Sequence, residues 1–383
     1  MPTMPRTDLS KTRGIGYCLL LALAALAVFA WAKLQVLPGL QGPVTFDGEH
    51  YLSIAQGGYH FDGILEHKQN ISFLPLMALA IKAALLLLPG LNAILAVVVL
   101  GFVILFVTLL GIHRLTHALY GQDAARIATL LWACSPLAFY NFTGYADPLY
   151  AALAVWTLKF TLDKRYWWAC LLAGMAVLAR PQAVVLVGIV AVALWWSSRH
   201  DGWRIVFTKA PLQAMTMALP IFALATYFVY AFGDAAAYVN SMEAWRLGSF
   251  SDGNISSLAQ IADLVKGASA AWPTLTLWTT LLTGVTLGFT LVLIALTPGN
   301  HPLVTSLFLG TLGFLMLMNA FSIINLARHV FFAVPWVILA GVAGTRAART
   351  PTRQLLALTP WLAFCLVINI VAVGRYYTGQ WVS

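Results

Sequence analysis

The sequence predicts an all-α protein that crosses a membrane several times, and three observations lead to this fold class. Hydrophobic residues make up 61% of the 383 positions and charged residues only 9%, whereas soluble domains carry about 25% charged residues. The mean hydropathy is +0.83. Apolar stretches long enough to span a bilayer recur along the whole chain. A water-soluble surface is therefore excluded, and we expect a single transmembrane domain over 1–383.

The apolar stretches predict about eleven transmembrane helices, some short enough to be pairs bent at a proline, since roughly 20 apolar residues cross the hydrocarbon core. The expected spans are 15–36, 92–112, 126–143, 148–161, 166–180, 182–198, 212–232, 273–297, 302–321, 329–345 and 355–374. Another apolar run, 73–88, is interrupted by Lys82 and ends at Pro89, so it either spans the membrane or lies along its surface.

The positions of the basic residues favour the surface location for 73–88. With that choice, most Lys and Arg residues fall on one side of the membrane, which the positive-inside rule identifies as cytoplasmic. They are Arg6, Lys11, Arg13, Arg114, Arg126, Lys164, Arg165, Arg199, Arg204, Lys209, Arg346, Arg349 and Arg353. We expect a cell-membrane protein with a cytoplasmic N-terminus and long extracytoplasmic loops at 37–91, carrying interfacial helices, and at 233–272.

The first of these loops holds the densest group of ionisable residues. They are Asp47, Glu49, His50, His60, Asp62, Glu66, His67 and Lys68. The segment 50–56 suits a short helix on the membrane surface that ends at Gly57-Gly58. Asp47 precedes this helix, so it is either a helix cap or a member of a site.

Further ionisable residues stand at the ends of spans on the same side: Asp147, Arg180, Arg328 and His329. A charge near hydrocarbon costs about 2.5–3.5 kcal/mol even on the lenient insertion scale, so the cations need anionic partners. Lipid headgroups and a bound phosphate are both open as partners for Lys68, Arg180 and Arg328, and Asp147 before Pro148 also suits a plain helix cap.

A carboxylate beside anion-binding cations at a membrane surface suits group transfer from a lipid phosphate. Asp47 would take the proton of an attacking hydroxyl, with Glu49 assisting or sharing a divalent cation such as Mg or Mn. Lys68, Arg180 and Arg328 would hold the phosphate. His50, His67, Asp147 and His329 would orient the substrates. No basic helix or aromatic–basic platform indicates nucleic acid as a partner.

The sequence around these residues resembles a known family. The run FDGEHYLSIAQGGYHF, followed by SFLPLMALAIK, is similar to the first luminal loop of PIG-V-type mannosyltransferases, with Phe46 in place of a Trp. The runs CSPLAFYNFTGYADPLYAAL, GMAVLARPQAVVL and RHVFFAVP resemble later segments of that family in the same order, with His329 in place of a Tyr.

The resemblance implies a GT-C glycosyltransferase fold with Asp47 as the main catalytic carboxylate. It also implies a polyprenyl-phosphate sugar as donor, transfer with inversion, and an acceptor that is a glycan, a lipid or a protein. The expected site is extracytoplasmic, in the ER lumen for a eukaryotic chain, and a prokaryotic member is the reading we favour. Two alternatives stay open: a transferase of another lipid-linked sugar, such as glucose or aminoarabinose, and a transporter or lipid flippase.

Overall fold

A computed structural model describes residues 6–37, 44–64, 67–200, 203–242, 274–296, 300–317, 328–347 and 350–379. Within these ranges the elements are all helical, as the composition predicts. They are α1 (Arg6–Val36), α2 (Asp47–Gly57), η1 (Asn70–Ser72), α3 (Pro75–Leu87), α4 (Ala93–Tyr120), α5 (Gln122–Ala133), η2 (Ala138–Phe142), α6 (Ala146–Leu162), α7 (Tyr166–Val177), η3 (Pro181–Ala183), α8 (Val184–His200), α9 (Trp203–Phe232), α12 (Thr274–Leu296), α13 (Pro302–Leu317), α15 (Pro335–Ala347) and α16 (Pro351–Tyr377).

The chain is a polytopic membrane protein. Five of the described helices are long and apolar enough to cross a bilayer, at Gly14–Val36, Ala93–Tyr120, Pro181–Arg199, Lys209–Phe232 and Leu356–Tyr377. Shorter apolar helices accompany them at Pro75–Leu87, Tyr166–Val177, Thr283–Ala295 and Pro302–Phe314. The expected total of about eleven spans stays a prediction.

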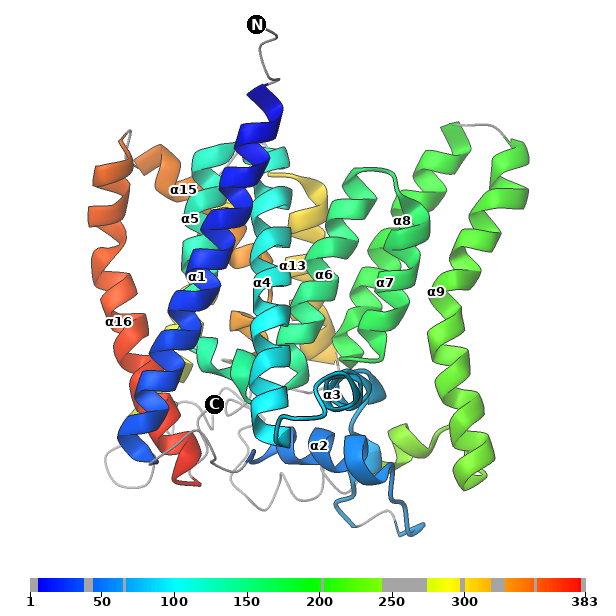
Figure 1. The fold of residues 1–383 in the computed structure, drawn as a ribbon. Helices are drawn as coiled ribbons and strands as arrows, with labels where there is room; N and C mark the ends of the chain where they lie inside the picture. The colour runs from blue at the N-terminus through cyan, green and yellow to red at the C-terminus, as the bar shows by residue number, and fades with distance from the viewer. Residues whose placement is uncertain are drawn as a thin grey trace, which may run out of the picture.

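The long helices run side by side, and two short helices cross them at one end. Figure 1 shows α1, α4, α6 and α9 extending from top to bottom, while α2 lies crosswise below them and α3 is seen nearly end-on. Tyr51 and Ile54 of α2 pack with Met77 and Ile81 of α3 in one apolar cluster that also includes Val97 of α4. Helix α3, the ambiguous run 73–88, therefore lies across the bundle rather than along it.

The predicted span 126–143 consists of two elements in the structure. Helix α5 ends at Ala133, and η2 begins five residues later. Pro136 lies between them and has no N–H group with which to continue a helix. Asn369 of α16 compensates the break, since its amide donates to the Ser135 carbonyl at 2.6 Å and accepts from the Phe139 N–H at 3.1 Å.

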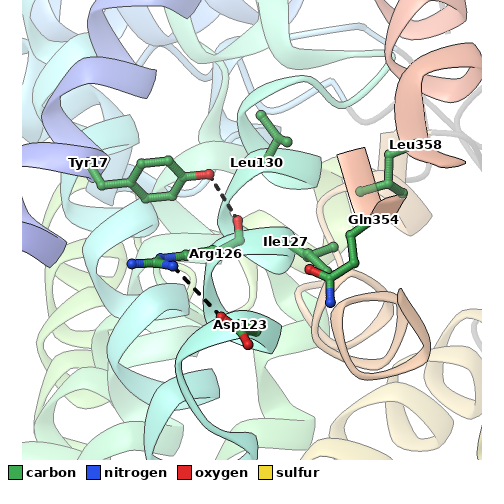
Figure 2. A pocket seen from close by; sticks show the side chains of 7 residues that line it. All are labelled: Tyr17, Asp123, Arg126, Ile127, Leu130, Gln354 and Leu358. Carbon is green, nitrogen blue, oxygen red and sulfur yellow. Dashed lines mark hydrogen bonds and ion pairs between the residues drawn. The ribbon is translucent and has the colours of Figure 1, made fainter. Parts of the chain in front are cut away.

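The end of the bundle opposite α2 contains the exposed basic turns. Helices α4, α6 and α8 end there and α5, α7, α9 and α16 begin there (Figure 1). Arg126 pairs with Asp123 at 3.7 Å, and both side chains are more than half exposed. They border a pocket of about 120 Å³ between α1, α5 and α16, into which Tyr17 and Gln354 also project (Figure 2).

Farther along the contact between α1 and α16, towards η2, the lining is apolar. A cavity of about 360 Å³ lies between α1, α16 and η2 and is lined by residues such as Ala25, Phe29, Phe142 and Ala363. Phe139 and Phe142 of η2 line this cavity, whereas Tyr140 of η2 faces the guanidinium group of Arg328. The second long loop predicted at 233–272 is described only as far as Met242, and the rest lies outside the described residues.

Candidate active site

Asp47 is the first residue of α2, and the backbone just ahead of it has an uncommon conformation. Phe46 has φ 54° and ψ −134°, a left-handed φ that side chains other than glycine rarely adopt and that is frequent at functional sites. Directly after Asp47 stands Gly48, and a Cβ at that position would collide with the Thr143 carbonyl oxygen. The start of α2 is thus pressed against the chain that leads into α6, which brings Asp47 towards Asp147.

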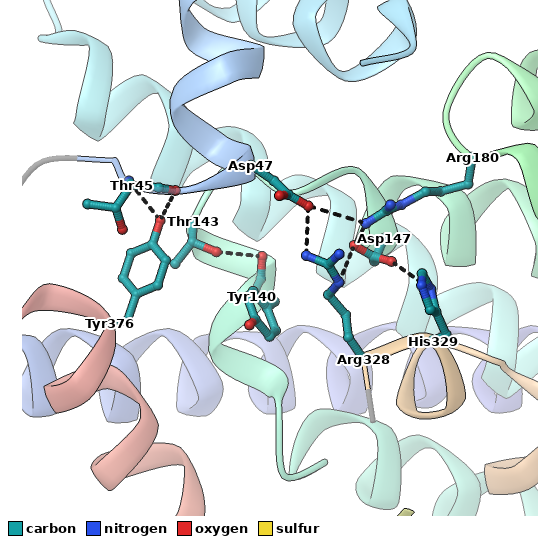
Figure 3. A network of polar contacts seen from close by, with 9 residues as sticks. All are labelled: Thr45, Asp47, Tyr140, Thr143, Asp147, Arg180, Arg328, His329 and Tyr376. Atoms are coloured by element: carbon teal, nitrogen blue, oxygen red, sulfur yellow. Dashed lines mark hydrogen bonds and ion pairs between the residues drawn. The ribbon is translucent and has the colours of Figure 1, made fainter. Parts of the chain in front are cut away.

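Four charged side chains from distant parts of the sequence meet at this point (Figure 3). Arg328 donates from Nη1 to Asp47 Oδ2 at 2.7 Å, and its Nε lies 3.6 Å from Asp147 Oδ2. Arg180 pairs directly with Asp147, and its Nη2 lies 3.9 Å from Asp47 Oδ2. The distance between His329 Nδ1 and Asp147 Oδ1 is 3.9 Å. We call Asp47, Asp147, Arg180, Arg328 and His329 the ionic cluster.

The two carboxylates of the ionic cluster differ in exposure. The side chain of Asp147 is fully buried at 0%, whereas Asp47 is 15% exposed and Arg180 13%. Two carboxylates and two guanidinium groups leave no net charge, which keeps the burial of four charges tolerable. Asp47 is therefore the more exposed of the two carboxylates, while the buried Asp147 lies between the two arginines.

Aromatic rings form one wall of the ionic cluster. The guanidinium carbon of Arg328 lies 5.1 Å from the centre of the Tyr145 ring and 5.9 Å from that of Tyr140. Such contacts attract a cation to the ring face. Both tyrosines belong to the segment between α5 and α6, and both are about 1% exposed. Their spacing follows no helical period, so only the fold reveals them.

Two residues of α2 that the sequence predicts for the site occupy different surroundings. Glu49 is exposed. The His50 ring stacks on Phe73 at 4.4 Å, and burial lowers the pKa of His50 although the carboxylates of Asp47 and Glu49 act in the opposite direction. His50 thus lies where α2 meets the segment leading into α3.

His67 and Lys68 lie in the connection between α2 and η1. His67 Nδ1 is 2.7 Å from Asp62 Oδ2, and the Gln69 amide donates to Asp62 Oδ1 at 2.6 Å. These bonds, led by the one to His67, hold the pKa of Asp62 below its usual value. Lys68 is exposed. In the structure, His67 thus belongs to a set of hydrogen bonds around Asp62 within this connection and not to the ionic cluster.

The residues present do not fit a divalent cation shared by Asp47 and Glu49. Among the described residues, no group of three His, Cys, Asp or Glu side chains is arranged to hold a metal ion. The groups nearest to the Asp47 carboxylate are guanidinium groups, which repel a cation. Hard divalent cations take six or more oxygen ligands, and this site supplies arginine donors instead.

The family comparison covers most of the ionic cluster. Residues 21–245 match the family model described as Mannosyltransferase (PIG-V). The chain belongs to this family. The matched part contains Asp47, Asp147 and Arg180, and it ends before Arg328.

Two curated relatives agree with this membership. The GPI alpha-1,6-mannosyltransferase 2 of Homo sapiens is 29% identical over 219 residues, which cover 51% of this chain and 42% of that protein. The protein of the same name from Cricetulus griseus is 28% identical over 214 residues, with the same coverage of each chain. The matched region thus spans less than half the length of these relatives.

A solved structure has a similar fold. The archaeal oligosaccharyltransferase AglB from Archaeoglobus fulgidus, solved in complex with an inhibitory peptide and a dolichol-phosphate, matches with a TM-score of 0.52 over 92% of this chain and 56% of that chain. The sequence identity is 12%, so the likeness concerns the fold alone.

Proposed function

We propose that this protein is a membrane-embedded mannosyltransferase that moves mannose from a polyprenyl-phosphate donor to a hydroxyl group, with inversion at the sugar carbon. The observation that carries the proposal is the ionic cluster, in which the partly exposed carboxylate of Asp47 stands beside the partly exposed Arg180 and the buried Arg328. Membership of the PIG-V mannosyltransferase family supports the sugar. The bound dolichol-phosphate of the AglB structure supports the lipid phosphate as leaving group.

In the proposed reaction, Asp47 acts as the general base. The acceptor oxygen attacks C1 of the donor sugar from the face opposite the phosphate, and its proton passes to the Asp47 carboxylate. The bond between C1 and the phosphate oxygen breaks, and the polyprenyl phosphate leaves with the electron pair. One bond forms as one breaks, which inverts the configuration at C1.

Arg180 and Arg328 hold the donor phosphate in this proposal. In the structure they neutralise Asp47 and Asp147, so a phosphate brings an additional negative charge and competes with Asp47 for Arg328. Arg328 then turns from the carboxylate to the departing phosphate, and Asp47 becomes available as a base. Guanidinium groups suit this task because their planar donors match phosphate oxygens and stay charged.

The proposed orientation places the ionic cluster and α2 outside the cytoplasm. The basic turns between α6 and α7 and near the start of α16 lie at the opposite end of the bundle (Figure 1). Positive residues favour the cytoplasmic side. The N-terminus is then cytoplasmic, and the donor meets the site at the outer surface of the membrane, where α2 and α3 lie crosswise. The acceptor is a glycan, a lipid or a protein on that side.

The test is Asp47→Asn in membranes supplied with polyprenyl-phosphate [¹⁴C]mannose. Loss of a general base lowers the rate by about 10²–10⁴-fold, measured as label transferred to the acceptors in those membranes. Asp123→Asn is the matched control, since Asp123 is exposed at the other end of the bundle. Transfer by Asp47→Asn at the wild-type rate would remove Asp47 from the chemistry.

Two further measurements separate the alternatives. Glu49→Gln shows whether Glu49 assists: a loss similar to that of Asp47→Asn assigns it a shared role, and a normal rate leaves Asp47 as the single base. A panel of polyprenyl-phosphate donors carrying mannose, glucose or aminoarabinose identifies the sugar. Movement of the donor across vesicles without any covalent product would support a flippase instead.

A further inference from the structure

We propose that Tyr376 of α16 is a positioning residue that fixes the backbone ahead of Asp47 and thereby directs the Asp47 carboxylate. The inference rests on the proposed function, because it assigns a task that only a catalytic Asp47 requires. Tyr376 lies outside the region 21–245 that matches the family model, and it is the next-to-last residue of α16.

The hydroxyl of Tyr376 binds both backbone groups of one residue. It accepts a hydrogen bond from the Thr45 N–H at 3.0 Å and donates one to the Thr45 carbonyl at 2.9 Å (Figure 3). The contact therefore restrains the peptide backbone at position 45, two residues before Asp47.

The residue between Thr45 and Asp47 explains why a restraint is needed. Phe46 has a left-handed φ of 54°, and such a conformation persists only when its surroundings hold it. The Phe46 ring lies 5.8 Å from the Tyr376 ring, with a tilt of 56°. Tyr376 thus contacts both residues that precede Asp47, one through its hydroxyl and one through its ring.

Tyr376 is itself firmly placed. It is 1% exposed, and its ring lies 5.8 Å from Phe139 and 6.4 Å from Tyr145. Tyr145 in turn faces the guanidinium group of Arg328, which donates to Asp47. Tyr376 therefore contacts both the backbone ahead of Asp47 and the ring of Tyr145, which lies beside Arg328. A ring alone would fill this space, so the hydroxyl is the part that the inference concerns.

Tyr376→Phe tests the hydroxyl, because it removes one oxygen atom and keeps the ring. We expect the apparent kcat for mannosyl transfer from polyprenyl-phosphate [¹⁴C]mannose to fall by about 10- to 100-fold, the range that a small misplacement of a reacting group produces. The apparent KM for the donor should change by less than about 2-fold, because uniform binding is untouched. Tyr377→Phe is the matched control, since it keeps the neighbouring ring and its contacts with Phe29, Lys33 and Tyr376 and removes only a hydroxyl.

A double variant distinguishes positioning from a merely structural role. If Tyr376 acts through Asp47, adding Tyr376→Phe to Asp47→Asn lowers the residual rate no further, as coupled sites are not additive. If Tyr376→Phe lowers the rate by the same factor in the wild-type chain and in Asp47→Asn, the inference is overturned. An unchanged kcat for Tyr376→Phe also overturns it. Size-exclusion profiles and melting temperatures establish that each variant is folded. Wild-type transfer by Asp47→Asn alone instead overturns the proposed function.

Discussion

Charged side chains are largely buried at one end of the helical bundle and exposed at the other. At the α2 end, Asp147 is fully buried, and Arg180 and Arg328 have side chains that are 13% and 5% exposed. At the opposite end, Arg126 and Asp123 form a longer pair of 3.7 Å with side chains 53% and 58% exposed. The first group is held within a few ångströms by four chain segments, whereas the second pair belongs to a single turn of α5.

The difference supports the proposed location of the active site at the α2 end. An exposed ion pair stabilises a protein by about 0–1 kcal/mol, because water screens it. Buried charges are costly to assemble and are weak evidence for stability as such. Asp147 and its arginines therefore need a reason other than stability, and an anion-binding catalytic site provides one. The exposed pair needs no explanation beyond the solvated, cation-rich surface on which it lies.

The largest expected effect comes from Asp147→Asn. Removing the charge leaves Arg180 and Arg328 with Asp47 as the shared carboxylate, and breaking a buried pair costs about 3–5 kcal/mol. The free energy of unfolding, measured by denaturant titration in detergent micelles, should fall by that amount. Transfer activity should fall with it, because the arginines lose their position.

Asp123→Asn provides the contrast for this experiment. A loss of stability for Asp147→Asn no greater than that for Asp123→Asn would contradict the distinction between the two ends. It would mean that water screens the ionic cluster as well as it screens the exposed pair.

An intermediate effect is expected at Gly48. A Cβ there would meet the Thr143 carbonyl oxygen, and forcing extra atoms into packed structure costs about 1–3 kcal/mol. Gly48→Ala should therefore shift α2 away from α6, lower the melting temperature and reduce transfer. Gly57→Ala, in the same helix, is the control, because nothing lies within 4 Å of its added Cβ. Equal melting temperatures for the two variants would refute the close contact.

The smallest effect is expected for Arg126→Gln at the opposite end. Its ion pair with Asp123 is exposed, and the bond from the Tyr17 hydroxyl goes to the Arg126 backbone, which the substitution retains. The free energy of unfolding should change by less than about 1 kcal/mol, and transfer should be unaffected. A loss of transfer similar to that of Asp47→Asn would indicate that the small pocket bordered by Arg126 takes part in the function.

Much of the fold was predictable because the bilayer restricts what an apolar chain can do. Backbone groups in hydrocarbon must be bonded internally, so long apolar stretches become helices. Composition and length therefore give the all-α class and most helix positions. Pro136 marks the break between α5 and η2 in the sequence, but the partner that compensates it, Asn369, lies more than two hundred residues away. Local apolar pattern carries no information about such a partner.

For the candidate site, the sequence indicated charged residues and missed the aromatic ones. Asp47, Asp147, Arg180 and Arg328 were predictable because a charge at the end of a span needs compensation. Glu49 and Lys68 were predicted with them from proximity in the sequence, and both are exposed in the structure. Tyr140 and Tyr145 lie in the family-like run CSPLAFYNFTGYADPLYAAL, but the sequence did not place their rings beside Arg328. Tyr376 was not singled out, since aromatic residues are common throughout an apolar chain. Their roles depend on which ring faces which group.

The sequence by itself determined that the chain is a helical membrane protein and that charge gathers at the ends of its spans, because hydrophobicity and charge are properties of each residue alone. Only the tertiary structure decided that Asp47 is the more exposed carboxylate, that Asp147 is the buried one, and that Tyr376 holds the backbone at Thr45. The physical reason is that burial, ion pairing and hydrogen-bond geometry arise between residues far apart in the chain. They exist only once α2, α6 and α16 have packed together.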